Sequence, residues 1–226
     1  MSLILHIDTA LEKAYVGLAR DGELLAEFEN IEQKEHASFV QPAIKEMLEQ
    51  LNLKPVNLDA VGVTIGPGSY TGLRVGMASA KGICYALKIP LITIGTLELY
   101  ASAALDQFPG YDAYCPMIDA RRNEVFTAVY DSTMVERMAP HALVLDPESF
   151  ERYFNQFGRV IFFGNGSEKF KSLAKSFQNA DFETIFYNGK HLASKIYANY
   201  CKKIYSDLAY SEPLYAKEFH STISKT

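Results

Sequence analysis

Cysteine is scarce in this sequence of 226 residues. The three cysteines, Cys84, Cys115 and Cys201, lie far apart and form no C-x-x-C pair. A disulfide framework or a cysteine-ligated zinc site needs paired, suitably spaced cysteines. The spacing argues against both, and we expect the three thiols to be ordinary packing residues.

The sequence also lacks a long hydrophobic run. The apolar part of the N-terminal segment ends at Asp8, which is too early for a signal peptide. No stretch of the sequence approaches the roughly 20 apolar residues of a membrane-spanning helix. We therefore expect a cytoplasmic protein without membrane association.

Positive charge is not in excess. The chain has 22 Lys and Arg against 27 Asp and Glu, a net charge of −5. Free-standing nucleic-acid binders usually carry a basic excess. The composition disfavours that class and leaves a local basic patch open.

Histidines with metal-ligand spacing are absent. His36 opens a predicted helix, but a helical metal pair needs a second histidine at position 40, where Val40 stands. The remaining histidines show no ligand spacing: His6, His141, His191 and His220. Neither a Ser–His–Asp arrangement nor a convincing carboxylate pair can be inferred. We predict no metal site and no intrinsic cofactor.

What the sequence does contain is enough apolar material for a substantial core. Hydrophobic residues make up 48% of the chain, and its length fits one large domain or two lobes of about 100 residues each. Residues 1–105 predict a first lobe of order β-β-β-α-β-α-β-α. Its elements are Leu3–Ile7, Tyr15–Leu18, Glu23–Phe28, His36–Leu51, Leu58–Ile65, Leu73–Leu87, Pro90–Ile94 and Leu97–Leu105.

Residues 106–226 predict a second lobe, whose last segment can return to the first. Its strands are Tyr114–Ile118, Glu124–Tyr130 and Val160–Phe163, and its helices begin near Asp146-Pro147-Glu148, Ser167 and Lys190. Phe219–Thr226 is expected to be a loose tail. Two α/β lobes, the first led by three strands, favour open mixed sheets with flanking helices, in an actin-like two-lobe fold.

A glycine-rich loop, Gly66–Gly72, joins a predicted strand to a predicted helix. Backbone N–H groups at such a place favour an anion. The spacing fits neither G-x-G-x-x-G, which needs glycine at Thr71, nor a P-loop, which ends in Gly-Lys-Ser/Thr. A tight turn that lets the helix pack on the sheet is the alternative.

The helix after this loop is apolar almost all round. Its charged residues, Arg74, Lys81 and Lys88, are spaced by seven and form one narrow stripe. Surplus apolar surface, also present on the helix His36–Leu51, indicates either burial within the chain's own fold or a helical interface with another chain. We predict an interface at Phe39, Val40, Ala43, Met47, Leu73, Arg74, Gly76, Met77, Ala80, Lys81 and Cys84.

Polar residues at strand ends suggest a vestigial nucleotide or anion site. Its candidates are Asp8, Thr9, Gly66, Gly68, Ser69, Thr71, Gly72, Asp119, Gly164 and Gly166. Each has a simpler alternative, since turn carboxylates cap local N–H groups and glycines permit tight turns. Arg121 and Arg122, next to Asp119, are either solvated at a hairpin tip or meet a carboxylate or phosphate on a partner.

Taken together, these segments resemble the TsaB (YeaZ-type) family of bacterial tRNA threonylcarbamoyladenosine biosynthesis subunits. The resemblance is strongest over Gly66–Gly82. It extends in order to Ile7-Asp8-Thr9-Ala10, His36-Ala37-Ser38, Ile118-Asp119-Ala120-Arg121, Glu124-Val125-Phe126 and Pro213-Leu214-Tyr215. Where relatives often show Pro-Val-Tyr-Leu-Arg, this chain has Pro213-Leu214-Tyr215-Ala216-Lys217.

The resemblance implies an actin-like ATPase (ASKHA) fold and a non-catalytic subunit. Such a subunit pairs through its two N-lobe helices with the catalytic paralogue TsaD, the threonylcarbamoyl transferase, and the ATPase TsaE joins the assembly. The product is N6-threonylcarbamoyladenosine at position 37 of ANN-reading tRNAs, and tRNA is reached only through the complex. A homodimer through the same helices is a further possibility.

Two departures from the catalytic paralogue support this interpretation. His36 is followed by Val40 instead of the second histidine of His-x-x-x-His, and Asp119-Ala120-Arg121-Arg122 replaces a second glycine-rich phosphate loop. Two alternatives stay open: an actin-like small-molecule kinase or ATPase, suggested by Asp8 and the glycine loops, and a metalloprotease, suggested by the glycoprotease label of relatives.

Overall fold

The computed structural model describes residues 1–217, which form two lobes, each built on a five-stranded mixed sheet. The N-lobe sheet has the order β3-β2-β1-β4-β5. Its strands are β1 (Leu3–Asp8), β2 (Ala14–Arg20), β3 (Glu23–Asn30), β4 (Ala60–Gly66) and β5 (Leu91–Gly95). The first three form an antiparallel meander, while β4 and β5 run parallel to β1.

The C-lobe sheet has the order β8-β7-β6-β9-β10. As in the N-lobe, its first three strands form an antiparallel meander and its last two run parallel to the first. Its strands are β6 (Ala113–Asp119), β7 (Glu124–Asp131), β8 (Glu136–Val144), β9 (Val160–Phe163) and β10 (Ala180–Glu183). Helices α4 (Glu151–Gln156) and α5 (Ser167–Lys171) belong to this lobe, whose core is rich in phenylalanine. Two lobes of mixed sheet with flanking helices are the predicted fold class, which is confirmed.

The N-lobe sheet is covered on both faces. Leu5 and Ile7 pack with α1 (His36–Gln50) and α2 (Tyr70–Leu87) on one face, while Ile4 packs on the other with Ile196 of α6 (Gly189–Cys201). Because both faces are covered, every residue of β1 is buried. Pro42 is tolerated inside α1, which begins at His36 as predicted.

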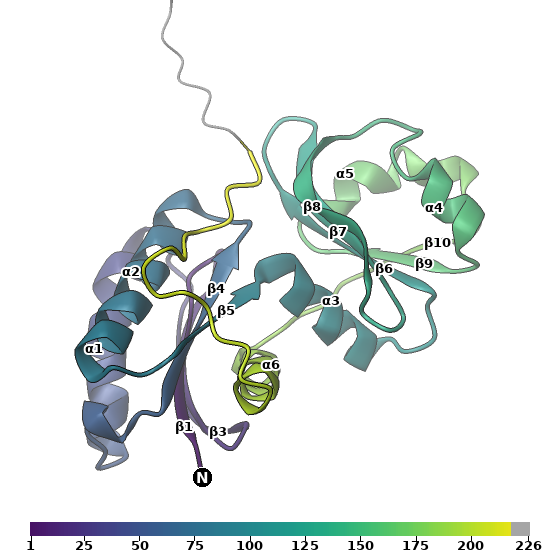
Figure 1. Ribbon diagram of the computed structural model, residues 1–226. Coiled ribbons are helices and arrows are strands. Elements are labelled where there is room, and N and C mark those ends of the chain that lie inside the picture. The colour runs from purple at the N-terminus through teal and green to yellow at the C-terminus, as the bar shows by residue number, and fades with distance from the viewer. Residues whose placement is uncertain (218–226) are drawn as a thin grey trace, which may run out of the picture.

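Helix α3 (Thr96–Gln107) lies between the lobes (Figure 1). Leu97, Ala101 and Ala104 pack into the C-lobe core with Tyr114 and Ile118. Other α3 residues, Leu99 and Ala103, pack into the N-lobe core. A helix that is apolar on two sides thus joins the two cores into one folding unit.

Helix α6, in the last segment of residues 106–226, packs on the N-lobe sheet. It contacts β1, β2, β3 and β5 of the first sheet, and Figure 1 shows it beside them. The physical reason is that the second face of this sheet is apolar, with Ile4, Ile92 and Ile94 among its residues, and must be covered. The Ile196 side chain occupies the space that a Cβ on Gly62 would need, and the His6 ring does the same over Gly17.

The segment after α6, residues 206–217, runs along α2 and ends at the C-lobe; we call it the strap (Figure 1). It begins against β5, where the Ser206 N–H donates to the Leu91 carbonyl oxygen at 2.8 Å. Lys81 Nζ donates to the carbonyl oxygens of Ala209 and Ser211, both at 3.0 Å. Its end reaches β8 and β7, where Ala142 N–H donates to the Ala216 carbonyl oxygen at 3.3 Å and Lys217 pairs with Glu124.

Several local expectations differ from the structure. Strands β8 and β10 are missing from the predicted elements. The helix predicted to begin near Ser167 does begin there but ends at Lys171, and a 3₁₀ turn follows at Ala174–Ser176. Cys84 and Cys115 are buried, but Cys201 is exposed at the end of α6, so the packing prediction is wrong for it. The tail Phe219–Thr226, with His220, lies outside the described residues. Within residues 1–217, no helix combines the length and apolarity needed to cross a bilayer.

Two glycines of α2 differ sharply in their surroundings. A Cβ on Gly72 would lie 2.0 Å from the Thr9 carbonyl oxygen, whereas a Cβ on Gly82 would meet nothing within 4 Å. We expect Gly72→Ala to lower the free energy of unfolding by about 1–3 kcal/mol because backbone must move. Gly82→Ala should raise it by about 0.5–1 kcal/mol through helix propensity. Urea denaturation of both variants checks this, and equal effects would contradict the packing described.

Candidate functional site

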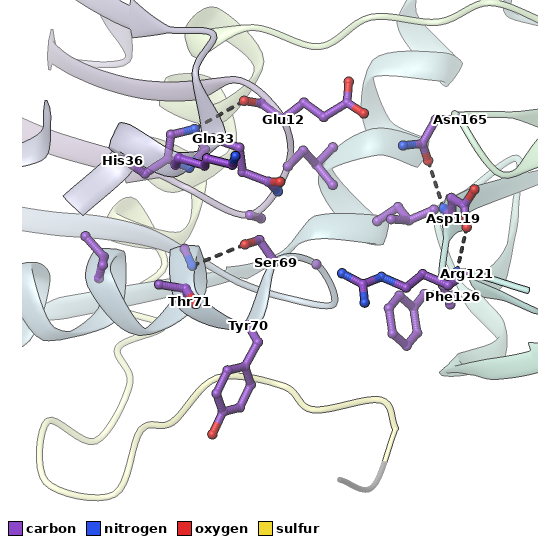
Figure 2. A pocket seen from close by; sticks show the side chains of 18 of the residues that line it. Glu12, Gln33, His36, Ser69, Tyr70, Thr71, Asp119, Arg121, Phe126 and Asn165 are labelled. Atoms are coloured by element: carbon purple, nitrogen blue, oxygen red, sulfur yellow. Dashed lines mark hydrogen bonds between the residues drawn. The ribbon is translucent and has the colours of Figure 1, made fainter. Parts of the chain in front are cut away.

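A cleft of about 980 Å³ separates the two lobes. The N-lobe wall comes from the β1–β2 turn, the start of α1 and the loop Gly68–Gly72, and the C-lobe wall from the end of β6, the β6–β7 turn, Asn165 and Lys169. Figure 2 shows Ser69 facing the Arg121 side chain across this space, while the Tyr70 side chain is directed away from it, toward the C-terminal segment. Loops that follow strands in both lobes thus converge on one cavity.

The glycine loop is held against the β1–β2 turn. A Cβ on Gly68 would lie 2.2 Å from the Ala10 carbonyl oxygen, and one on Gly76 would lie 2.5 Å from Thr9 Oγ1. Ser69 N–H donates to the Ala10 carbonyl oxygen at 2.7 Å, and the Thr9 hydroxyl donates to the Gly72 carbonyl oxygen at 2.7 Å. These glycines therefore permit close packing of backbones, which is what the tight-turn alternative expected. Ser69, Thr71 and Gly72 also line the cleft. Gly66, with φ of +108°, lies behind them against Leu73.

Glycines also permit close backbone packing in the C-lobe, at the end of β6. A Cβ on Gly164 would lie 2.3 Å from the Met117 carbonyl oxygen, and one on Gly166 would lie 3.0 Å from the Ile118 carbonyl carbon. Both glycines therefore hold the loop before α5 close to β6. Neither glycine lines the cleft between the lobes. Asn165, which lies between them in the sequence, does line it.

Asp8 is fully buried, and both oxygens of its carboxylate accept hydrogen bonds. Oδ1 accepts from the Thr64 hydroxyl at 2.6 Å and from the Ala10 N–H at 2.9 Å, and Oδ2 accepts from the Tyr187 hydroxyl at 2.8 Å. Burial raises the pKa of the Asp8 carboxyl, and these donors oppose that rise. Asp8 therefore does not line the cleft, and Tyr187, which no sequence pattern indicated, donates to its Oδ2.

Asp119 is committed to local contacts. Its Oδ1 accepts from Lys169 Nζ and from the Arg121 N–H, each at 2.6 Å, and its own N–H donates to Asn165 Oδ1 at 2.8 Å. The hydrogen bond from Lys169 is the main cause that lowers the pKa of the Asp119 carboxyl. Among residues 1–217, no cluster of three or more His, Cys, Asp and Glu side chains is placed to hold a metal ion.

Most of the predicted interface residues lie inside the N-lobe core. Seven side chains or glycines are buried in this chain itself: Val40, Ala43, Met47, Leu73, Gly76, Met77 and Ala80, and Cys84 is buried with them. Phe39 is half-buried against the same core. The apolarity of α1 and α2 thus reflects their packing on the sheet and on each other. The buried side chains among them are not exposed for contact with a partner in this conformation, whereas Phe39 is partly exposed.

The two charged residues of the predicted interface hold the strap. Arg74 Nε donates to the Tyr215 hydroxyl at 3.0 Å and its guanidinium lies 4.1 Å from the Tyr70 ring centroid, while Lys81 binds two strap carbonyls. On the side of Arg74 and Lys81 that is nearer to α1, helix α2 has an exposed face without charged residues. Its residues at helical spacing are Thr71, Val75, Ala78, Gly82, Tyr85 and Ala86.

The chain matches the family model described as TsaD, tRNA N6-adenosine threonylcarbamoyltransferase, over residues 24–201. It is 30% identical to the tRNA threonylcarbamoyladenosine biosynthesis protein TsaB of Bacillus subtilis over 172 residues, 75% of this chain and 74% of that protein. It is 31% identical to TsaB of Escherichia coli over 175 residues, 76% of this chain and 75% of the relative.

Solved structures agree with the fold. YeaZ from Pseudomonas aeruginosa superposes with a TM-score of 0.77 at 23% identity, covering 95% of this chain and all of that one. A ROK-family transcriptional regulator shares the fold more distantly, with a TM-score of 0.52 at 9% identity, covering 87% of this chain and 77% of the regulator. By its sequence matches, the chain belongs to the TsaB family, whose members are named tRNA threonylcarbamoyladenosine biosynthesis proteins.

Proposed function

We propose that this chain is a non-catalytic subunit of the complex that forms N6-threonylcarbamoyladenosine in tRNA. In this proposal it binds a TsaD-type catalytic paralogue, a TsaE-type ATPase joins the pair, and tRNA is reached only through the assembly. It acts in the cytoplasm and needs no cofactor of its own. The biosynthetic role rests on the names of the TsaB relatives.

The observation that carries the partner proposal is the exposed, uncharged face of α2. Small residues at Ala78, Gly82 and Ala86 let another helix approach closely, and Tyr85, 79% exposed, supplies the kind of aromatic side chain that anchors interfaces. The paralogue offers a matching helix if it shares this fold, as the family model implies. A second copy of this chain is the competing occupant of the same face.

The absence of catalysis is supported by the state of Asp8. In a working actin-like kinase, an acidic residue at this place holds a metal–nucleotide group. Here Thr64, Ala10 and Tyr187 donate to both oxygens of the carboxylate. Releasing it to a metal would leave these buried donors unpaired, which costs free energy.

An actin-like kinase or ATPase is the second candidate, favoured by the size of the cleft. Calorimetry with ATP and Mg²⁺ on the isolated chain separates the two. Tight binding that Asp8→Ala abolishes would support the enzyme, and the non-catalytic proposal would then fail.

Gly82 gives a test of the interface that does not disturb the fold. Because a Cβ there meets no neighbour, Gly82→Arg should leave the melting temperature within a few degrees of the parent. It should weaken the complex with the TsaD-type partner by about tenfold or more, since it places a charged side chain in a close helix contact. Size-exclusion chromatography and calorimetry measure this.

The matched control is Gln156→Arg, an exposed position on α4 of the C-lobe. It should leave the complex unchanged. If Gly82→Arg binds the partner like the parent chain, α2 is not the interface. Met77 is unsuitable for this purpose because its side chain is only 4% exposed.

Tyr187→Phe tests the structural role of Asp8. Without the Tyr187 hydroxyl, Asp8 Oδ2 loses its donor in a buried site, so the variant should lose about 1–3 kcal/mol of unfolding free energy at neutral pH. The pKa of Asp8, already raised by burial, should rise further. Because the penalty falls on the ionised carboxylate, it should shrink as the pH falls through that pKa.

Urea denaturation at a series of pH values measures this loss. Tyr85→Phe, which removes a hydroxyl from an exposed ring, is the control and should change little. A loss in Tyr187→Phe that does not vary with pH would show that Asp8 is not the group affected.

A further inference from the structure

The strap carries the chain from the N-lobe to the C-lobe for a second time. The first crossing is α3, a helix packed into the cores of both lobes. The strap crosses close to the cleft, because the Tyr215 ring lies 5.3 Å, centroid to centroid, from the ring of Tyr70, a residue of the cleft lining. Figure 1 shows the end of the strap beside the C-lobe. A segment in this position bears on how far the two lobes can separate.

The N-lobe holds the strap through its core, its backbone and its side chains. Leu208 packs against the N-lobe core, and the Lys81 ammonium binds two strap carbonyl oxygens. The Leu214 N–H donates to the Ile65 carbonyl oxygen at 2.7 Å. The Leu214 carbonyl oxygen lies so close to Gly66 that a Cβ there would be 3.0 Å from it. The strap is therefore docked on the N-lobe along most of its length.

The C-lobe holds the end of the strap by a hydrogen bond and an ion pair. The Ala142 N–H of β8 donates to the Ala216 carbonyl oxygen at 3.3 Å, which is long for such a bond. The Lys217 ammonium pairs with the Glu124 carboxylate, and both side chains are partly exposed. Water and salt weaken ion pairs near the surface. The attachment to the C-lobe is therefore the weaker of the two.

The two attachments are separated by very little chain. A fully extended chain spans about 3.3–3.6 Å per residue, so residues 214–216 reach about 10 Å at most. While Leu214 is bound to Ile65 and Ala216 is bound to Ala142, the end of β4 and the strand β8 must stay close to that distance. The lobes can therefore move apart on this side of the cleft only when one attachment breaks.

We propose that the strap is a latch that holds the cleft closed. With both attachments made, it keeps the two lobes at the separation seen in this structure. When residues 216 and 217 leave the C-lobe, the lobes turn about α3 and the cleft opens, while the rest of the strap stays on the N-lobe. Every contact of this latch lies within the chain, so it does not depend on the proposed function.

Spin labels on the two walls of the cleft measure the separation of the lobes. Lys34→Cys and Arg122→Cys place them at exposed positions on opposite walls, and Cys201→Ser removes the exposed native thiol. In this background, Lys217→Glu sets two carboxylates against each other and releases the latch. Electron paramagnetic resonance on the full chain should then show a mean distance between the labels that is longer by more than about 2 Å.

A charge swap is the matched rescue. Glu124→Lys alone should also lengthen the distance between the labels, because it faces Lys217 with a second ammonium. Combining Glu124→Lys with Lys217→Glu restores an attractive pair and should return the distance to that of the labelled parent. Lys202→Glu makes the same charge change at an exposed position at the end of α6 and should leave the distance unchanged.

Amide hydrogen exchange, followed by NMR, shows which end of the latch releases. In the parent chain, the Ala142 N–H should exchange at least about tenfold faster than the Leu214 N–H, because only the first depends on the C-lobe attachment. Lys217→Glu should speed exchange at Ala142 further and leave Leu214 within about twofold of the parent.

Four results would overturn the proposal. These are a label distance that Lys217→Glu and Glu124→Lys leave unchanged while circular dichroism shows both folded, a double variant that stays as open as the single ones, an equal change in Lys202→Glu, and a Leu214 N–H that exchanges as fast as the Ala142 N–H. All these measurements use the chain without a partner. Failure here therefore leaves the proposed function standing, and failure to bind the TsaD-type partner leaves the latch standing.

Discussion

The close approach of the β1–β2 turn to the start of α2 is the constraint on which the site depends. Three glycines spaced by four, Gly68, Gly72 and Gly76, remove the side chains that would separate the two backbones. Hydrogen bonds through Ser69 N–H and the Thr9 hydroxyl then hold the contact. The C-lobe repeats it with Gly164 and Gly166 at the end of β6. The cleft thus lies between two lobes whose bordering loops are both held by close backbone contacts at glycines.

This contact has opposite effects on the two ends of the site. At the end of β1, the tight turn brings the Ala10 N–H to Asp8, so the carboxylate is taken up by the fold. At the start of α2, the same turn places Tyr70, Thr71 and Gly72 in the cleft lining, and the small-residue face of the helix is exposed. The same contact thus holds the Asp8 carboxylate within the fold and leaves the small-residue face of α2 exposed.

Sequence reasoning reached the two-lobe architecture because periodicity and strand–turn–helix order are local properties. The N-lobe elements were placed within a few residues of their observed bounds. Strands β8 and β10 were not predicted, because their residues are mostly half-buried or exposed and show little alternation of buried and exposed positions. The interface residues were chosen by apolarity, which cannot separate a helix face that packs on its own sheet from one that meets a partner. The Asp8–Tyr187 hydrogen bond joins residues 179 positions apart, and no local pattern announces it.

The position of α6 has a consequence for the order in which the chain can fold during synthesis. The second face of the N-lobe sheet is completed only by residues 189–201, whose Ile196 side chain fills the space over Gly62. The strands of the N-lobe sheet are therefore synthesised well before α6, the helix that covers their second face. The strands of the C-lobe are made in between. Domains of many proteins fold in sequence as they emerge. Here the sheet of the first lobe is covered on both faces only after every strand of the second lobe has been made.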